Sequence, residues 1–379
     1  MKKAILVLLC CAMLAATISC NKENDIYDID NNVHNTPSTD MTAQSDGNTN
    51  TDNSDTIDLE YVRWNNIDPV HYSNMEFYSN GDGTCSVGSL GLADILDVVI
   101  PSTSPNGDVV TEIIGGIYVD PRVTSVVIPN TVTKIHSQAF VAMDSLKEVF
   151  IPNTVTEIGW SAFEGLTCLE SIVIPGSVKT IGEKAFKDCT NLKSVTLSYG
   201  IQEIEKLSFY NCISLKSIEI PDSVTNIGCG VFGDCTSLEN VVLSNNTAFI
   251  PSYAFYNCAK MNNIVIPNTV TRIGEYAFEL CESIESIVIP NGITEFEVLT
   301  FAHCKSLVSI TIPKSVQTIQ MRVFAECDKL SNIYFDGTIE EWNSIYKKDG
   351  WDRSFLSSEW AMCNITIYCS DGQIIHSVE

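Results

Sequence analysis

The chain repeats itself every 23 residues over most of its length. A residue that ends a predicted strand returns at this interval without an insertion, at Ile128, Ile151, Ile174, Leu197, Ile220, Leu243, Ile266, Ile289, Ile312 and Phe335. Phenylalanine keeps the same interval from Phe140 to Phe324. A unit this short cannot bury its apolar face alone, so each unit must stack on its neighbours and share a continuous core. The repeat therefore predicts a solenoid.

Each repeat contains two extended segments and a turn. The motif Leu-x-x-Ile-x-Ile alternates with period two, as a half-buried strand does, and the Pro that usually follows ends the strand because it lacks an N–H group. Val-x-x-Ile gives a second, shorter extended piece. Ala-Phe-x-x-Cys has helical spacing over barely one turn. The predicted fold class is an α/β solenoid with a parallel β-sheet on the concave face and short helical or 3₁₀ turns on the convex face.

The repeat consensus, I-P-x-x-V-x-x-I-G-x-x-A-F-x-x-C-x-x-L-x-x-I-x-I, resembles the BspA-like leucine-rich repeats of bacterial surface lipoproteins. The resemblance covers residues 100–335. Residues 81–117 resemble the degenerate first coils of that family, and we expect residues 57–99 to form an N-terminal cap. Residues 336–379 resemble the C-terminal cap of the family. The resemblance implies that tryptophans of this cap cover the exposed core of the last coil, as terminal units of an array must; these are Trp342, Trp351 and Trp360.

The N-terminus has the features of an export signal. Lys2 and Lys3 precede an apolar run that is too short to span a membrane, and small residues follow. The segment before Cys20 resembles a bacterial lipobox, although Thr17 stands where leucine is usual. We expect residues 1–19 to be a lipoprotein signal peptide and Cys20 to carry the lipid. The alternative is a plain secretory signal.

Residues 20–56 are rich in Asn, Asp, Thr and Ser and poor in hydrophobic residues. Such a segment cannot bury enough apolar surface to offset its chain entropy, so we predict a disordered acidic tether.

Seven of the 15 cysteines share one place in the repeat, and they are Cys189, Cys212, Cys235, Cys258, Cys281, Cys304 and Cys327. Met143 and Leu166 fill the same place in earlier repeats. A metal site would need converging ligands, and a stack of equivalent thiols does not provide them. We therefore interpret these cysteines as small buried hydrophobic residues and predict no metal site.

The sequence gives little sign of catalytic chemistry. The five histidines are isolated in the sequence, and we found no phosphate-binding glycine loop and no nucleophile motif. The excess of 47 acidic over 22 basic residues disfavours nucleic acid as a partner. We expect no enzyme activity and no cofactor.

The outward positions of the predicted strands form the candidate binding surface. One outward column carries large or β-branched residues, and we take as candidate ligand-binding residues Val127, Phe150, Val173, Val242, Val265, Val288 and Tyr334. The column two residues earlier is mostly Ser and Asn. An apolar stripe beside a hydroxyl and amide stripe could hold an extended partner. Equally, Val and Thr suit any exposed sheet.

The resemblance implies a surface-attached adhesion or protein-binding module. Its expected partners are extracellular or cell-surface proteins, from the host matrix or from other bacteria. We expect the chain at the bacterial outer membrane or cell surface, attached to the membrane through its N-terminal lipid. The alternatives are a surface carbohydrate-binding lipoprotein that supports glycan uptake and an enzyme or enzyme accessory.

Overall fold

The computed structural model describes residues 75–89, 96–115, 121–352 and 364–376. The chain divides into two compact units, Met1–His71 and Tyr72–Glu379, and all described residues belong to the second. The expectations for the signal peptide, for Cys20, for the tether and for Trp360 lie outside the described residues.

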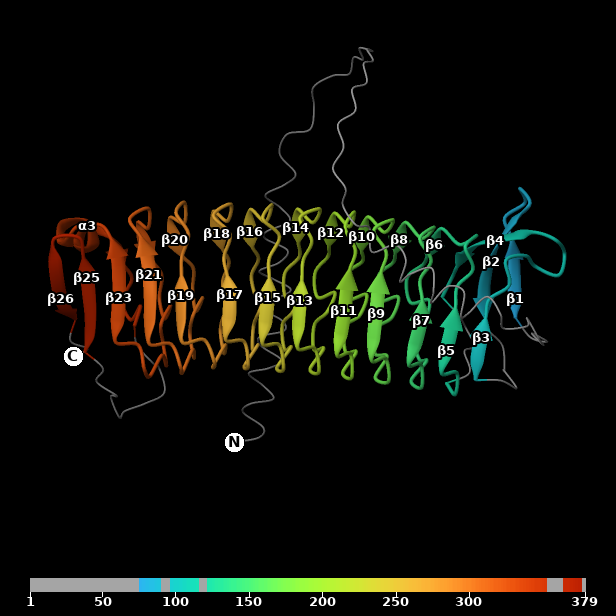
Figure 1. Cartoon of the computed structure of the whole chain (residues 1–379), viewed down its shortest axis with the longest axis horizontal. Helices are drawn as coiled ribbons and strands as arrows, with labels where there is room; N and C mark the ends of the chain where they lie inside the picture. The colour runs from blue at the N-terminus through green and yellow to red at the C-terminus, as the bar shows by residue number, and fades with distance from the viewer. Residues whose placement is uncertain (1–74, 90–95, 116–120, 353–363, 377–379) are drawn as a thin grey trace, which may run out of the picture. The chain divides into compact units, whose positions relative to one another are not determined.

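The second unit is a solenoid with two rows of parallel strands, and its front row faces the viewer in Figure 1. The row is divided into four hydrogen-bonded sheets, with breaks after β7, β11 and β17, and strands within each sheet pair in register, for example Val242 with Val265. A final antiparallel strand ends the row. In chain order, the front row consists of β3 (Asp97–Val99), β5 (Ser125–Val127), β7 (Glu148–Phe150), β9 (Ser171–Ile174), β11 (Ser194–Leu197), β13 (Ser217–Glu219), β15 (Asn240–Val242), β17 (Asn263–Val265), β19 (Ser286–Val288), β21 (Ser309–Pro313), β23 (Asn332–Asp336), β25 (Ile365–Cys369) and β26 (Gly372–His376).

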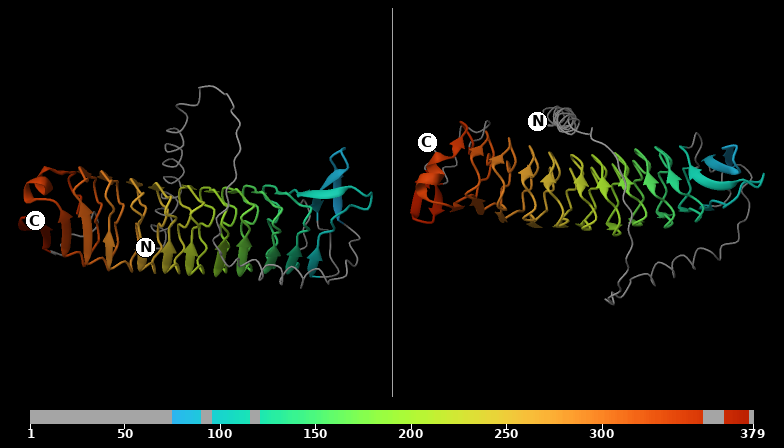
Figure 2. Two further views of the ribbon diagram at one scale, coloured as in Figure 1. Left: turned by 45° about the horizontal axis from the view of Figure 1, so that its top comes forward. Right: turned by 90° about the horizontal axis from the view of Figure 1, so that it is seen from above.

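The second row comes from the Val-x-x-Ile part of each repeat and runs beside the first (Figure 2). Most of its strands have only two residues, because the chain must turn again before the next coil. An antiparallel strand, β1 (Glu76–Ser79), pairs with its first member. In chain order, the second row consists of β2 (Thr84–Ser89), β4 (Val109–Ile113), β6 (Lys134–Ile135), β8 (Glu157–Ile158), β10 (Thr180–Ile181), β12 (Glu203–Ile204), β14 (Asn226–Ile227), β16 (Phe249–Ile250), β18 (Arg272–Ile273), β20 (Glu295–Phe296), β22 (Thr318–Ile319) and β24 (Tyr346–Lys347). The predicted parallel solenoid is confirmed.

The core lies between the two rows and the turns, and it is built from the repeat columns. Nine phenylalanines, from Phe140 to Phe324, form a continuous buried stack. Adjacent rings in this stack are nearly parallel, with centroids 4.8 Å apart at Phe140 and Phe163 and 5.9 Å apart at Phe301 and Phe324. Because each ring within the stack contacts the rings of both neighbouring coils, the stack couples the coils to one another.

The Ala-Phe-x-x-Cys segments, where we expected short helical pieces, form turns instead. In each repeat, the residue just before this segment and the residue four positions later have left-handed backbone with φ between 52° and 77°. The first column of such residues runs from Gln138 to Arg322, and the second runs from Ala142 to Glu326. Left-handed residues interrupt a right-handed helix. Their N–H groups point to the next coil instead, as where Ser161 N donates to Glu183 O at 2.8 Å and Asp188 N donates to Tyr210 O at 2.9 Å.

These turns add a third line of backbone hydrogen bonds between coils, beside the two rows of strands. Phe163 N donates to Ala185 O and Phe209 N donates to Val231 O, each reaching 22 residues along the chain. The three lines together satisfy backbone groups that short isolated strands would leave unpaired.

The left-handed turns give a prediction with a clear sign. Ala142 is exposed and has φ of 70°, a conformation that glycine adopts without the Cβ penalty. We expect Ala142→Gly to raise the free energy of unfolding by about 0.5–1 kcal/mol. The same change at Ala259, which lies outside the left-handed positions, should lower it by a similar amount. Urea unfolding of both variants checks this, and a loss of stability at position 142 would indicate a helical segment.

The C-terminal end of the array is closed by one helix and two tryptophans. Helix α3 (Ile339–Ser344) begins with a capping box between Thr338 and Glu341. Trp342 packs edge-on against Phe335, and Trp351 packs edge-on against Phe324, so both cover the last rings of the core. Within the described ranges, no helix has the length and hydropathy of a membrane span.

Candidate binding surface

The outward side chains of the front row form one line across the coils, because parallel strands in register place equivalent residues side by side. Val127 pairs with Phe150, and Val288 and Tyr334 both pair with Thr311. We call this line the apolar stripe. It comprises Val127, Phe150, Val173, Val242, Val265, Val288, Tyr334 and Tyr368, with Thr196, Glu219 and Thr311 in the remaining places.

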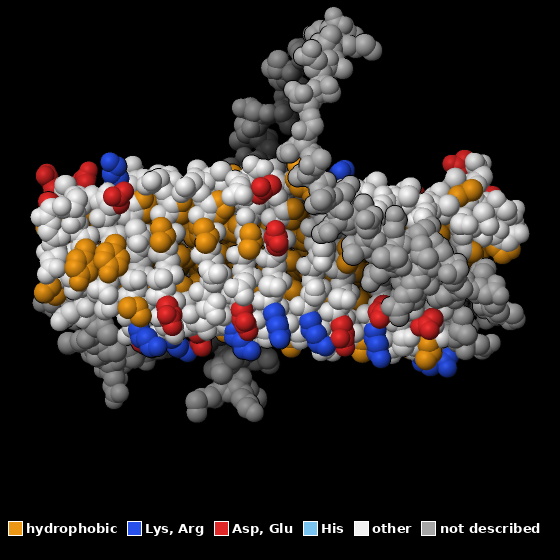
Figure 3. Space-filling model, viewed as in Figure 1, with side chains coloured by type: hydrophobic (Ala, Val, Ile, Leu, Met, Phe, Trp, Pro, Cys, Tyr) orange, Lys and Arg blue, Asp and Glu red, His pale blue; other side chains and the backbone are white. Residues whose placement is uncertain are grey.

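The stripe is most exposed on the C-terminal half of the array. The exposed fractions are 56% for Val242, 74% for Val265 and 66% for Val288, against 46% for Val173. Val127 and Phe150 are only half-buried rather than exposed. Figure 3 shows hydrophobic side chains gathered in a row across this face. The most exposed apolar side chains of the stripe therefore lie on β15, β17 and β19.

A stacked tyrosine pair ends the stripe. Tyr334 and Tyr368 pair across β23 and β25, with ring centroids 5.2 Å apart and planes 19° apart. Sequence analysis missed Tyr368, because the interval from position 334 to position 368 is 34 residues instead of 23. The alternating segment Ile-Thr-Ile-Tyr could have identified it. Tyrosine combines an apolar ring with a polar hydroxyl, and it is a frequent anchor of protein interfaces.

The hydroxyl and amide column lies beside the apolar stripe. Ser171, Ser194, Asn240 and Asn263 are all exposed on the front row, so they can donate to and accept from a partner. Ser125 differs, since it is buried and donates to Asp97 Oδ1 at 2.8 Å. The face thus combines apolar contact area with hydrogen-bonding groups along one direction.

Comparison with known proteins identifies the repeat. The model of the BspA type leucine rich repeat region matches residues 111–239 and 225–346, which together are more than half of the chain. The chain belongs to the BspA-type leucine-rich repeat family. No curated protein matched it.

Several solved structures of bacterial proteins are similar to this chain. The pneumococcal vaccine antigen PcpA is 20% identical with a TM-score of 0.53, over 75% of this chain and 86% of that one. A leucine rich cell surface protein from Faecalibacterium prausnitzii is 26% identical with a TM-score of 0.37, over 74% and 98%. A leucine-rich repeat protein from Bacteroides ovatus is 23% identical with a TM-score of 0.33, over 76% and 100%. The likeness to PcpA concerns the fold alone.

The seven stacked cysteines of the BspA-type repeats are buried, as expected for small core residues. Each thiol donates to the carbonyl oxygen of the phenylalanine 26 residues earlier, as Cys258 does to Phe232 O at 3.2 Å. Burial raises the pKa of the Cys189 thiol to about 12, so it stays protonated at neutral pH. In the part of the chain that the structure describes, no group of three or more His, Cys, Asp or Glu could hold a metal ion.

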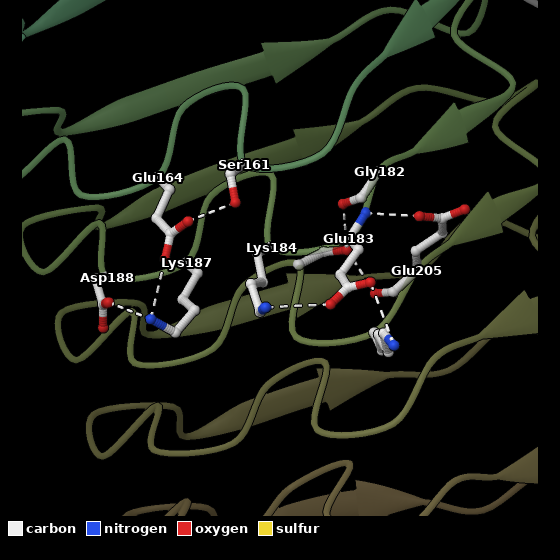
Figure 4. A network of polar contacts seen from close by, with 10 residues as sticks. Ser161, Glu164, Gly182, Glu183, Lys184, Lys187, Asp188 and Glu205 are labelled. Atoms are coloured by element: carbon white, nitrogen blue, oxygen red, sulfur yellow. Dashed lines mark hydrogen bonds and ion pairs between the residues drawn. The ribbon is translucent and has the colours of Figure 1, made fainter. Parts of the chain in front are cut away.

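The turn side of the BspA-type array carries ion pairs between coils. Lys187 bridges Glu164 of the preceding coil at 3.1 Å and its neighbour Asp188 at 2.5 Å. Glu183 contacts both Lys184 and Lys206, at 3.2 and 3.3 Å (Figure 4). Half-exposed pairs of this kind contribute little stability each. They place both positive and negative side chains on this part of the surface, which is therefore well hydrated.

The described histidines also pair between coils rather than with one another. His136 lies 2.8 Å from Glu112, and His376 lies 2.8 Å from Asp352. His303 lies 3.9 Å from Glu279. The three pairs are on separate coils, so they do not converge into one acid–base cluster.

Glu279 gives a pH-dependent prediction. Its carboxyl packs near Tyr256 and Tyr276, and burial raises its pKa to about 7, from 4.5. The carboxylate therefore destabilises the folded state increasingly as pH rises from 4.5 to 7, and the cost is constant above that. We expect Glu279→Gln to stabilise the protein by about 3 kcal/mol at pH 8 and to have no effect at pH 4. Thermal melts across this range check it, and an equal effect at both pH values would contradict it.

Proposed function

We propose that this BspA-type protein is a non-catalytic protein-binding module at a bacterial cell surface, and that the apolar stripe contacts the partner. The main observation is the row of exposed Val242, Val265 and Val288 beside hydrogen-bonding Ser and Asn. Exposed contiguous apolar surface of this kind marks interaction sites more often than chance. Leucine-rich repeat proteins generally mediate protein–protein interactions, which supports the same function.

The expected partners are extracellular proteins, either of a host matrix or of other bacterial surfaces. An array of such proteins and of glycans, probed with the purified chain, tests this directly. Binding to proteins supports the proposal. Binding to glycans alone would favour the alternative of a carbohydrate-binding lipoprotein that supports glycan uptake. If the chain binds neither proteins nor glycans, the result would contradict an adhesive function.

We further propose that Cys20 carries the lipid that attaches the chain to the outer membrane or cell surface. Acyl chains contribute about 0.8 kcal/mol for each buried CH₂ group, so two or more chains anchor a protein stably.

Metabolic labelling of cells with a fatty-acid analogue should mark the wild-type protein and should not mark Cys20→Ala. The fraction of chain in the membrane pellet should fall in parallel. Labelling that persists in the variant would refute lipidation at this position and would favour the plain secretory signal.

A further inference from the structure

The outward positions of the front row carry negative charge and no positive charge. Within the described strands from β5 to β25, the charged residues at these positions are Glu148, Glu219 and Asp336. Lysines lie at the margin of this face, one residue before a strand begins at Lys147, Lys193 and Lys216 and one residue after β21 at Lys314. Of these, Lys193 forms an ion pair with Glu170 at 2.8 Å.

Glu219 is the carboxylate that interrupts the apolar stripe. It is exposed at the end of β13 and pairs in register with Val242. Within the described residues, no cationic side chain forms an ion pair with it. A partner that covers Val242 and Val265 would therefore also cover this carboxylate, and burying it without a counter-charge is costly.

We infer that the partner is an extended polypeptide segment that presents a basic side chain to Glu219 and apolar side chains to Val242, Val265 and Val288. This inference rests on the proposed function and adds the chemistry of the partner. A second copy of the chain is disfavoured, because each copy has a net charge of −25 and the two would repel.

A library of short random-sequence peptides displayed on phage tests the inference against the full chain. The baits are the wild type, Glu219→Lys and a charge reversal on the second row, Glu157→Lys, which removes the ion pair of Glu157 with Lys134. We expect the wild type and Glu157→Lys to enrich peptides that combine Lys or Arg with apolar residues. Glu219→Lys should lose this preference and should weaken binding of the enriched peptides about tenfold or more.

A fourth bait, Val265→Lys, separates the inference from the proposed function. If enriched peptides lose affinity for this bait but show no preference for basic residues, the stripe binds polypeptides and the assignment of Glu219 is wrong. If peptides bind all four baits equally, the proposed function of the stripe fails as well. Melting temperatures of the variants confirm that each bait is folded.

Discussion

Replacing Val242, Val265 and Val288 together with lysine is expected to weaken binding of the protein partner about 100-fold or more. The three side chains are exposed and contiguous, so the lysines would place charges in the contact without disturbing the core. Each lysine charge that the partner buries without a counter-charge costs free energy. The favourable apolar contact of the valine is also lost. Binding isotherms with a protein identified on the array measure the loss.

A matched control lies on the same three coils. Ala248, Thr271 and Thr294 are exposed just before β16, β18 and β20. Lysine at these three positions changes the net charge by the same amount, so any general electrostatic effect is equal. We expect the control to bind like the wild type, and both triple variants to melt close to the wild type. Loss of binding in the control alone would place the site on the second row.

The second large effect concerns the phenylalanine stack. Phe232 is fully buried, with ring centroids 5.7 Å from Phe209 and 5.8 Å from Phe255. Phe232→Ala should lower the free energy of unfolding by about 3–5 kcal/mol, because it removes the ring and leaves a cavity in the middle of the array.

Urea unfolding of Phe232→Ala measures this loss, with Val265→Ala as the control. The control removes an exposed side chain, and we expect it to change stability by less than about 0.5 kcal/mol. A loss below about 1 kcal/mol at Phe232 would show that the stack does not couple the coils.

The strand rows and the core followed from the sequence, because their residues repeat without interruption. Alternation around positions such as Ile172 and Ile174 determines which side chains point inward, and both are buried. The conformation of the turns could not be predicted from the sequence. Left-handed backbone at Tyr253, Leu280 and Arg322 carries no residue signature, since glycine or asparagine is usual at such positions. Hydrogen bonds to the next coil favour that conformation, and a single repeat does not reveal them.

The candidate stripe was predicted in position but not in extent. Regular spacing identified its members from Val127 to Tyr334, whereas the longer interval before β25 concealed Tyr368. Exposure also varies along the stripe, and periodicity alone assigns equal exposure to every coil. The half-buried state of Phe150 moves the preferred binding surface toward Val265.

Site-specific crosslinking tests the central claim, that the front row contacts the partner, most directly. A photoreactive phenylalanine analogue is placed either at position 265, on the apolar stripe, or at position 271, just before strand β18 of the second row on the same coil. We expect irradiation with the bound protein partner to give a crosslinked product from position 265 and none from position 271. Crosslinking from position 271 alone would contradict the assignment of the apolar stripe as the binding surface.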